Sequence, residues 1–466
     1  EQVLARAAGA PLVDGNRVRL LCDARENYPA WLAAIANARR VVLFENYIIQ
    51  NDSAGQRFAE ALIERARAGV RVCVIYDWFG GLGLGSRRLL KPLRDAGGEV
   101  RVFNPLSIAS PLGWMQRDHR KMLAVDGRVG FVSGMCVGAR WDGNPARGIA
   151  PWRDTGVEVT GPAVADLERA FAQVWVACGS PLPESLLTRA ADMPRAGNVT
   201  LRVLASQPYT AGLYRLDQLI ASMATRTLWL TDAYYVGLAP YVRALRAAAL
   251  DGVDVRLLVP GASNLMAVST LSRVGYRTLL EAGVRVFEWN GPMLHAKTAV
   301  ADGRWARVGS TNLNASSWLA NHELDVAVED AAFAGELESV YEHDLTNATE
   351  VLLSPRRRVL PVTRRARARG RFRGSASRAA AGALLIGNTV QAAISNQRLL
   401  GPAEAGIMGM MGLMLIVLVV AGLLWPLVIV LPLCGFGAWV GVSLLIRAYR
   451  LRREGIKNAG SDPPVT

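Results

Sequence analysis

The sequence predicts an α/β protein in which two pseudo-symmetric α/β lobes form one active site, followed by a C-terminal helical transmembrane hairpin. Three observations lead to this fold class. Strand-like segments alternate with helical segments of about 10–15 residues, which is typical of α/β units with largely parallel sheets. The same order of segments occurs twice before residue 355. Near the C-terminus, Ile407–Ile446 contains no charged residue.

In the first half, short apolar stretches alternate with amphipathic ones. Apolar residues at every second position predict strands, whereas apolar residues three and four positions apart predict helices. This pattern predicts the strands Arg17–Cys22, Val41–Ile49, Val70–Tyr76, Val100–Phe103 and Lys121–Val125, the helices Trp31–Asn37 and Ala61–Gly69, and a segment, Leu89–Asp95, that leads into the fourth strand.

The second half repeats this order. It predicts the strands Val199–Leu204, Thr227–Val236, Val253–Val259, Val284–Trp289 and Lys297–Ala301 and the helices Leu216–Met223 and Ala244–Gly252. Tandem units of this kind indicate two lobes, residues 1–180 and 198–353, with a proline-containing connector near Gly179–Gly197. The alternative is a duplication in which the two lobes share no site, and the motifs distinguish between the two possibilities.

Charge and cysteine content restrict the class of protein. The chain of 466 residues has a formal net charge of +14, which suits a polyanionic partner, either nucleic acid or the anionic surface of a membrane. No CxxC pair occurs, so the cysteines indicate neither a disulfide framework nor a zinc site. They are scattered, at Cys22, Cys73, Cys136, Cys178 and Cys434.

Two matched motifs carry the chemistry. Each has the pattern His-x-Lys-x4-Asp, beginning at His119 and at His295, 176 residues apart. Residues two apart on a strand project from the same face, so each histidine is expected beside its lysine. An ammonium group neutralises phosphate oxygens, and an imidazole serves as nucleophile or as general acid–base near neutral pH. The aspartate closes a turn, where a structural role is as plausible as a catalytic one.

A segment of small residues follows each motif. Small side chains allow backbone N–H groups and a hydroxyl to approach phosphate oxygens closely. The first half therefore offers Ser133 and Gly134, and the second half offers Ser310 and Asn312, as phosphate-binding residues.

Residues 15–355 resemble the phospholipase D superfamily, on the two motifs, the Gly309-Ser310-x-Asn312 sequel and the repeat. Four further segments resemble those of bacterial cardiolipin synthases: Tyr76–Gly80, Arg117–Lys121, Trp152–Thr155 and Gly161–Val164. The resemblance implies a two-step phosphoryl transfer without metal or other cofactor. It implies the catalytic residues His119, Lys121, Asp126, His295, Lys297 and Asp302.

In that resemblance one histidine attacks the phosphodiester and the other protonates the leaving alcohol. By analogy His119 is the nucleophile and His295 the acid–base, with the site where the lobes meet. Glu323 matches a position whose carboxylate orients a catalytic histidine, and Asp154 is its candidate counterpart in the first half. Both are also consistent with ordinary turn or surface acids.

The first half departs from the pattern of the family. Ser133-Gly134 and Cys136 stand where Gly-Gly and an asparagine are usual, and Gly156 stands where a bulkier polar residue is common. We interpret Cys136 as a packed small residue rather than a nucleophile. These changes alter the residues from which the resemblance implies phosphate contacts in the first half.

The C-terminal part changes in composition. Residues 354–400 form a basic tether that includes Arg364–Arg378, and residues 401–453 contain the apolar block. One membrane span needs about 20 apolar residues, so the block fits two spans or a re-entrant hairpin. Positive residues flank both of its ends, which predicts that the catalytic lobes lie in the cytoplasm. The resemblance to bacterial enzymes implies that the membrane is a bacterial inner membrane. A buried hairpin of a soluble domain is the less favoured alternative.

These features favour transfer of a phosphatidyl group between membrane phospholipids, giving cardiolipin and glycerol from phosphatidylglycerol. The expected partners are anionic phospholipids and the membrane, and the apolar block argues against nucleic acid and hence against a nuclease. Hydrolysis by the same site to phosphatidic acid is one alternative. A non-catalytic membrane scaffold with the same fold is another, kept open by Cys136 and Gly156. The sequence leaves the oligomeric state open.

Overall fold

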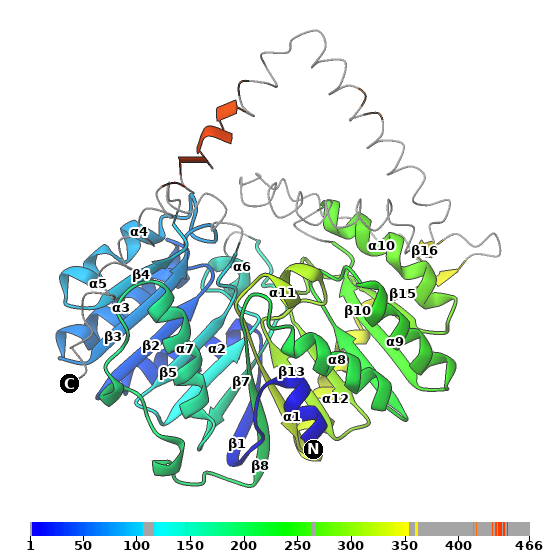
Figure 1. Ribbon diagram of the computed structural model, residues 1–466, viewed down its shortest axis with the longest axis horizontal. Helices are drawn as coiled ribbons and strands as arrows, with labels where there is room; N and C mark the ends of the chain where they lie inside the picture. Colours follow the sequence, from blue (N-terminus) through cyan, green and yellow to red (C-terminus); the bar gives the residue numbers. More distant parts are fainter. Residues whose placement is uncertain are drawn as a thin grey trace, which may run out of the picture. The chain divides into compact units, whose positions relative to one another are not determined.

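The computed structural model describes residues 2–105, 116–144, 146, 148–262, 266–353 and 359–361, with isolated positions between 413 and 445 (Figure 1). Contacts divide the chain into two units, of which the first comprises Glu1–Phe103 with Arg117–Leu399 and the second Asn104–Gln116 with Leu400–Thr466. Both predicted lobes belong to the first unit, except for residues 104–116 of the first lobe. The predicted transmembrane segment 401–453 and most of the tether 354–400 lie outside the described residues. Within the described part of the chain, no helix is long and apolar enough to cross a membrane.

The elements of the first half follow the predicted order closely. After α1 (Gln2–Ala8), they are β1 (Val13–Cys22), α2 (Asp23–Ala36), β2 (Val41–Asn46), α3 (Ser53–Arg67), β3 (Arg71–Asp77), α4 (Ser86–Leu89), α5 (Lys91–Asp95), β4 (Glu99–Phe103), β5 (Lys121–Val125), β6 (Val129–Ser133), α6 (Ala139–Asp142), β7 (Thr155–Thr160) and α7 (Val164–Ala177).

The second half repeats them. Its elements are β8 (Val199–Ser206), α8 (Gly212–Met223), β9 (Thr227–Thr231), α9 (Ala239–Leu250), β10 (Asp254–Pro260), α10 (Met266–Leu280), β11 (Arg285–Trp289), β12 (Thr298–Ala301), β13 (Trp305–Gly309), α11 (Ala315–Leu319), β14 (Glu323–Glu329), α12 (Ala331–Leu345), β15 (Ala348–Leu353) and β16 (Val359–Pro361). Two short 3-10 turns lie in the predicted connector, η3 (Glu184–Leu186) and η4 (Ala190–Asp192).

Local residue choices explain these boundaries. Helix α3 begins after Asp52, whose carboxylate accepts hydrogen bonds from the N–H groups of Ala54 and Gly55. Helix α12 begins in the same way after Asp330, which accepts from the N–H of Phe333. Such caps satisfy N–H groups that have no partner within the helix. The strand β2 is buried on both faces, as expected from its run of apolar residues.

The strands form one sheet, in the order β16-β15-β11-β10-β9-β12-β13-β14-β8-β1-β7-β6-β5-β2-β3-β4. Antiparallel pairing of β1 with β8 joins the two halves at its centre. The prediction of largely parallel sheets is wrong, because the pairs β2–β3, β3–β4, β9–β10 and β10–β11 alone are parallel among the described strands. The Asp-Gly turns after β5 and β12 are too short for a crossover, so each makes an antiparallel hairpin.

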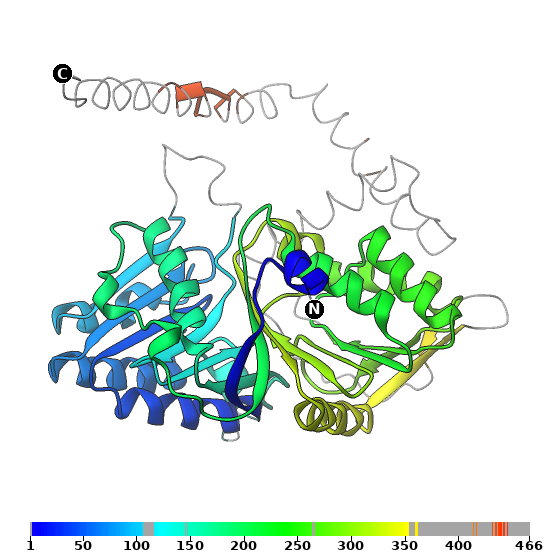
Figure 2. The same ribbon diagram turned by 60° about the horizontal axis from the view of Figure 1, so that its bottom comes forward.

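Helices cover both faces of this sheet (Figure 2). The equivalent helices α7 and α12 pack on one hydrophobic core that contains strands of both halves. Helices α2 and α3 cover a second core in the first half, and α8, α9 and α10 cover a third in the second half. The N-terminal helix α1 packs against α8, where Arg215 donates to the carbonyl of Ala7. The halves are therefore joined through shared sheet and shared core.

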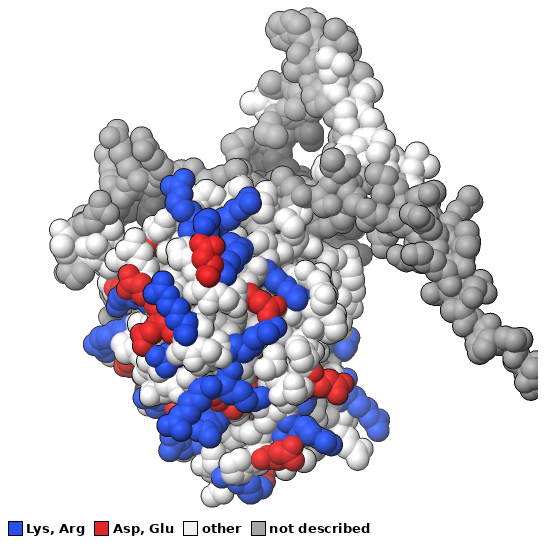
Figure 3. Space-filling model, turned by 90° about the vertical axis from the view of Figure 1, so that its left-hand side faces the viewer, with Lys and Arg blue, Asp and Glu red and all other residues white. Residues whose placement is uncertain are grey.

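The outer face of the first half carries basic and acidic side chains intermixed (Figure 3). Several pair with each other, such as Arg57 with Asp142 and Lys91 with Asp95. Exposed pairs of this kind contribute about 0–1 kcal/mol each to stability. The fold is consequently held by its cores rather than by these surface charges.

Candidate active site

The two motif histidines lie just before equivalent strands. His119 precedes β5 by two residues, and His295 precedes β12 by three. The motif lysines lie at or beside the strand starts, so the expected strand geometry begins only at the lysine. Lys297 Nζ nevertheless lies 3.0 Å from His295 Nδ1, and the ammonium of Lys121 donates to the carbonyl of His119. The spacing of two residues therefore brings the ammonium group to the imidazole in the second motif, and to the histidine backbone in the first.

A carboxylate from the second half holds His119. Its Nδ1 lies 2.8 Å from Glu323 Oε2 and 3.0 Å from Oε1. Glu323 is fully buried and also accepts hydrogen bonds from the Ser310 hydroxyl at 2.6 Å and the Asn321 amide at 3.1 Å. Because a carboxylate only accepts, Nδ1 of His119 carries the proton and Nε2 is left as the basic nitrogen.

A carboxylate from the first half holds His295 in the same way. Its Nδ1 lies 2.8 Å from Asp154 Oδ2, which also accepts a hydrogen bond from Trp141 Nε1 at 3.0 Å. The other oxygen of Asp154 accepts from the N–H of Thr155 at 2.9 Å. Asp154 is fully buried, so these donors replace the water that it loses.

Each histidine is thus oriented by the opposite half of the molecule. The backbone repeats the exchange, since His119 N donates to His322 O at 2.9 Å and His295 N donates to Arg153 O at 2.7 Å. Short β-bridges pair Asp118 with His322 and Arg153 with Leu294. Neither half contains a complete site, which answers the alternative of a duplication without a shared site.

Aromatic rings surround the two imidazoles. Tyr47 contacts His119 at a ring-centroid distance of 5.0 Å. Trp141, Trp152 and Tyr234 contact His295 at 5.4, 5.6 and 5.8 Å. His119 retains 12 % exposure of its side chain and His295 only 6 %. The site is therefore largely dry, which strengthens electrostatic interactions within it.

Burial keeps both imidazoles neutral in the free protein. It lowers the pKa of His119 to about 4, against the pull of the Glu323 carboxylate. Burial, with the nearby charge of Lys297, lowers the pKa of His295 to about 3, against the pull of Asp154. Burial also lowers the pKa of Lys297 to about 8. A neutral imidazole with Nδ1 protonated has the lone pair on Nε2 that a nucleophile needs.

These pKa shifts predict a dependence of stability on pH. In the unfolded chain both histidines take up protons near pH 6.5, whereas folded His119 and His295 remain neutral until the pH approaches 4 and 3. The free energy of unfolding therefore falls as the pH drops below about 6.5. A variant carrying His119→Asn and His295→Asn lacks this loss, so its stability relative to the wild type rises by about 4 kcal/mol from pH 7 to pH 5.

Urea denaturation at the two pH values measures this difference. His343→Asn, a substitution of an exposed histidine on α12, is the comparison variant in the same measurement. A relative stability of the double variant that is the same at both pH values would contradict the neutral, buried state of the two imidazoles.

The motif aspartates lie at the opposite end of the strands. The carboxylate of Asp126 accepts from the N–H groups of Arg39, Arg40 and Val41, each at 2.8 Å. Asp302 accepts from the N–H groups of Thr225, Arg226 and Thr227. Burial would raise the pKa of Asp302, but these N–H groups hold it below its ordinary value. The sequence left both a structural and a catalytic role open for the motif aspartates. The geometry supports the structural role, because the aspartates do not reach the histidines.

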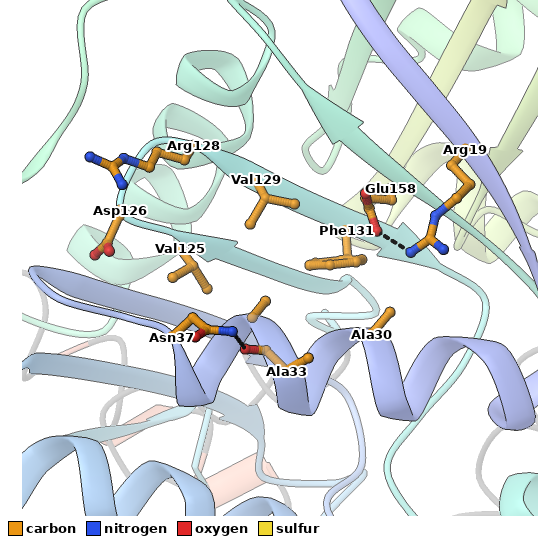
Figure 4. Close-up of a pocket in the computed structure, with 11 residues that line it drawn as sticks. Arg19, Ala30, Ala33, Asn37, Val125, Asp126, Arg128, Val129, Phe131 and Glu158 are labelled. Atoms are coloured by element: carbon orange, nitrogen blue, oxygen red, sulfur yellow. Dashed lines mark hydrogen bonds and ion pairs between the residues drawn. The ribbon is translucent and has the colours of Figure 1, made fainter. Parts of the chain in front are cut away.

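Asp126 also borders a shallow groove between α2 and the β5–β6 hairpin (Figure 4). Apolar side chains such as Val125, Val129 and Phe131 line it, and an ion pair between Arg19 and Glu158 closes one side. The groove lies at the aspartate end of β5 and contains neither motif histidine. It is separate from the candidate active site.

The predicted phosphate-binding residues have different positions. The Ser310 hydroxyl donates to Glu323 and accepts from Leu324 N at 2.9 Å, so it supports the carboxylate instead of facing a phosphate. The hydroxyl of Ser133 accepts from Met135 N at 3.0 Å. A Cβ on Gly134 would lie 2.3 Å from Asp154 Oδ1, so glycine makes room for that carboxylate. Asn312 is buried, and its direct contact with phosphate stays a prediction.

The residues by which the first half departs from the family pattern fit each other in the structure. Ser133 pairs with Gly156 across β6 and β7, and the equivalent pair in the second half is Gly309 with Asp325. A Cβ on Gly156 would lie 2.1 Å from the side chain of Asn27, which fills the space. Cys136 is buried, and burial raises the pKa of its thiol to about 11, so it is no thiolate nucleophile at neutral pH. The packed-residue interpretation of Cys136 is confirmed.

Two buried arginines were not identified as site residues from the sequence, although both belong to segments that were quoted. Arg120 donates to the carbonyls of Glu323, Ala170 and Ser206, at 3.1, 2.6 and 3.0 Å. Arg153 donates to Asp344 Oδ1 at 2.8 Å and to Asp23 Oδ1 at 3.2 Å. In the sequence, the only sign of a role for these arginines is that each lies next to a site residue. Their hydrogen-bond partners come from distant segments of the chain.

Removing Arg153 is expected to destabilise the fold. Arg153→Leu leaves the buried carboxylate of Asp344 without its cation, which costs about 3–5 kcal/mol of unfolding free energy. Adding Asp344→Asn removes that unpaired charge and restores part of the loss. Urea denaturation measures both variants. Arg285→Leu breaks an exposed pair with Glu350 and costs less than about 1 kcal/mol as the control; an equal cost for Arg153→Leu would contradict the role of the buried pair.

Among the residues that the structure describes, no group of three or more His, Cys, Asp or Glu side chains is arranged to hold a metal ion. The site does contain two lysine side chains, those of Lys121 and Lys297. Both are buried beside the histidines.

Two fused α/β halves that each supply one His-x-Lys-x4-Asp motif define the phospholipase D superfamily. Residues 216–345 match the family model described as cardiolipin synthase, PLD-like domain. Cardiolipin synthase A of Pseudomonas aeruginosa strain LESB58 is 36% identical over 365 residues, which cover 77% of this chain and 73% of that protein. Cardiolipin synthase A of Pseudomonas fluorescens strain SBW25 is 37% identical over 351 residues, covering 73% and 71%.

A solved structure shows the same fold. Phosphatidylserine synthase of Haemophilus influenzae Rd KW20 matches with a TM-score of 0.57 and 14% identity, covering 74% of this chain and 91% of that one. The chain belongs to the cardiolipin synthase family of phospholipase D-like proteins.

Proposed function

We propose that this protein is a phosphatidyltransferase that converts two molecules of phosphatidylglycerol into cardiolipin and glycerol. The observation that carries this function is the pair of neutral imidazoles, each held at Nδ1 by a carboxylate of the opposite half. Membership of the cardiolipin synthase family supports the same substrate class. Its partners are then anionic membrane phospholipids, and we place it at a bacterial inner membrane with its catalytic lobes in the cytoplasm.

The first step forms a covalent intermediate. His119 Nε2 attacks the phosphorus of one phosphatidylglycerol, a P–N bond forms, and the P–O bond to the glycerol headgroup breaks. The leaving alkoxide takes a proton from His295 Nε2, so glycerol departs and His295 becomes neutral. The Glu323 carboxylate stabilises the positive charge that develops on the phosphorylated imidazole. We assign His119 as nucleophile because its side chain is the more exposed of the two.

The second step reverses the roles of acid and base. A headgroup hydroxyl of a second phosphatidylglycerol gives its proton to His295 Nε2 and attacks the phosphorus. The P–N bond breaks, cardiolipin forms, and His119 is again neutral. Lys121 and Lys297 neutralise the phosphate oxygens in both steps. Because His295 is neutral in the free protein, its Nε2 must take up a proton from solvent before the first step, and the anionic phosphodiester favours this by raising the pKa of His295.

The experiment is an incubation of the full chain with phosphatidylglycerol in liposomes, without added metal, with products read by mass spectrometry. Cardiolipin and glycerol in equal amounts are expected. If phosphatidic acid is the only lipid product, the protein is a phospholipase D hydrolase and not a transferase. The variant with His119→Ala and His295→Ala is the control. If the wild type forms no more product than this variant, the enzymatic function is wrong and a membrane scaffold is left.

A further inference from the structure

One end of the sheet carries both histidines, and four surface segments emerge at that end. Asn46 at the end of β2 pairs with Lys121, and Ser206 at the end of β8 pairs with Glu323. The segments that follow β3, β6, β8 and β13 therefore all leave the sheet on the side of the histidines. Figure 1 places α4, α6 and α11, which belong to three of these segments, at the same upper end of the two lobes.

Each of the four segments exposes a large apolar side chain. The exposed fractions are 36% for Leu82, 43% for Ile149, 83% for Tyr209 and 38% for Leu319. Single exposed apolar residues are ordinary, but four around one site are a feature of a contact surface. We call these four residues the apolar rim. Two of them belong to each half.

Backbone hydrogen bonds fix part of the rim. Tyr209 N donates to Leu319 O at 2.9 Å, which holds these two exposed residues next to each other. Tyr209 has a backbone φ of +68°, a left-handed conformation that is strained for tyrosine. The loop that presents Leu82 is tied at its base by Asn51 N, which donates to Leu84 O at 3.0 Å. The exposure of these side chains is thus built into the fold.

Basic side chains adjoin the rim. Arg87 and Arg88 on α4 are both exposed and follow the Leu82 loop directly. Figure 3 shows Lys and Arg side chains at the upper end of the outer face of the first half, as well as further down. Lys91 is exposed close by but pairs with Asp95 at 2.7 Å. Exposed guanidinium groups beside exposed apolar groups suit a surface with anionic headgroups over an apolar interior.

We propose that this end of the two lobes docks on an anionic lipid bilayer. The apolar rim enters the headgroup region, and Arg87 and Arg88 contact lipid phosphates. The loop that presents Leu82 adjoins the active site, because Gly80 near its start lies against the backbone of Tyr47, whose ring contacts His119. A phosphodiester then enters the site from the plane of the bilayer. This inference rests on the proposed function for its substrate and adds the surface by which the substrate is reached.

The first test reverses charges on matched surfaces. Arg87→Glu with Arg88→Glu is compared with Arg39→Glu and Arg128→Glu, two exposed arginines at the aspartate end of the sheet. On vesicles of phosphatidylglycerol and phosphatidylcholine the first pair lowers kcat/KM at least about tenfold, because each basic residue adds to the attraction. On monomeric dihexanoyl-phosphatidylglycerol its activity stays within about twofold of the wild type. Equal losses for both pairs on vesicles would overturn the proposed surface.

The second test substitutes apolar residues. Leu82→Asp with Tyr209→Asp lowers activity on vesicles and spares activity on the monomeric lipid. Met223→Asp with Leu250→Asp, at exposed positions at the ends of α8 and α9, changes neither. A loss on the monomeric lipid as well would assign the rim to the integrity of the site and not to docking.

A third measurement separates docking from catalysis. Amide hydrogen exchange of the full wild-type chain is compared with and without the same vesicles. Protection of residues 80–88, 148–151, 207–211 and 316–320, with none at 37–40 and 126–129, is expected. If the protein is inactive on every lipid but these segments are protected, the docking surface stands and the proposed function fails. Absence of protection from these segments overturns the docking surface.

Discussion

Replacing His119 by alanine is expected to lower phosphatidyl transfer by at least about 10⁴-fold, because the variant has no nitrogen to form the covalent intermediate. KM for phosphatidylglycerol changes little, since Lys121 and Lys297 still neutralise the phosphate. Steady-state assays on phosphatidylglycerol vesicles measure the loss. The exposed His343 on α12, replaced by alanine, is the control and keeps wild-type activity.

The companion variant His295→Ala separates the two roles. It removes the proton donor, so the first step slows by about 10²–10⁴-fold with the glycerol leaving group. With a phosphatidyl ester of p-nitrophenol, whose leaving group needs no proton, the first step proceeds and the lipid stays bound to His119. Mass spectrometry of the intact variant then shows an added phosphatidyl group, and His119→Ala shows none. The opposite pattern would exchange the roles of the two histidines.

The sequence predicted the parts of the site that local spacing determines. The strand before and after each motif, the pairing of each histidine with its lysine and the repeat of both halves depend on residues close in the chain. The shared site was also predicted, because two incomplete motifs at a constant offset imply one constellation. Asp154 and Glu323 were named as orienting carboxylates, and their contacts with His295 and His119 agree with that hypothesis.

What escaped prediction depends on distant segments. Which carboxylate faces which histidine is set by the crossing of β-bridges between the halves, and no local pattern records it. The antiparallel centre of the sheet follows from β1 pairing with β8 across the two repeats. Arg120 and Arg153 act through carbonyls and carboxylates remote in sequence. Asp126 and Asp302 stand at fixed spacing for a structural reason, since their carboxylates hold the start of the neighbouring strand.

Replacing Glu323 by glutamine is expected to lower kcat by about 10³-fold with little change in KM. The attacking imidazole gains a positive charge when its Nε2 binds phosphorus, and the carboxylate at Nδ1 stabilises that charge. A glutamine oxygen still accepts the Nδ1 proton but carries no charge. Its NH2 group must also face either Ser310 or Asn321, both of which donate to the native carboxylate.

Asp154→Asn has the corresponding effect on the acid–base. Both oxygens of Asp154 accept from N–H groups that cannot reverse, those of Trp141 and Thr155, so an asparagine side chain loses at least one hydrogen bond in either orientation. The kcat of Asp154→Asn therefore falls, because both protonation of the leaving alcohol and activation of the acceptor depend on His295. Glu342→Gln, at an exposed position on α12, is the matched control.

The result that would contradict this mechanism concerns Glu323. Activity of Glu323→Gln within about threefold of the wild type would mean that no charge develops on His119, and the covalent mechanism would have to be abandoned.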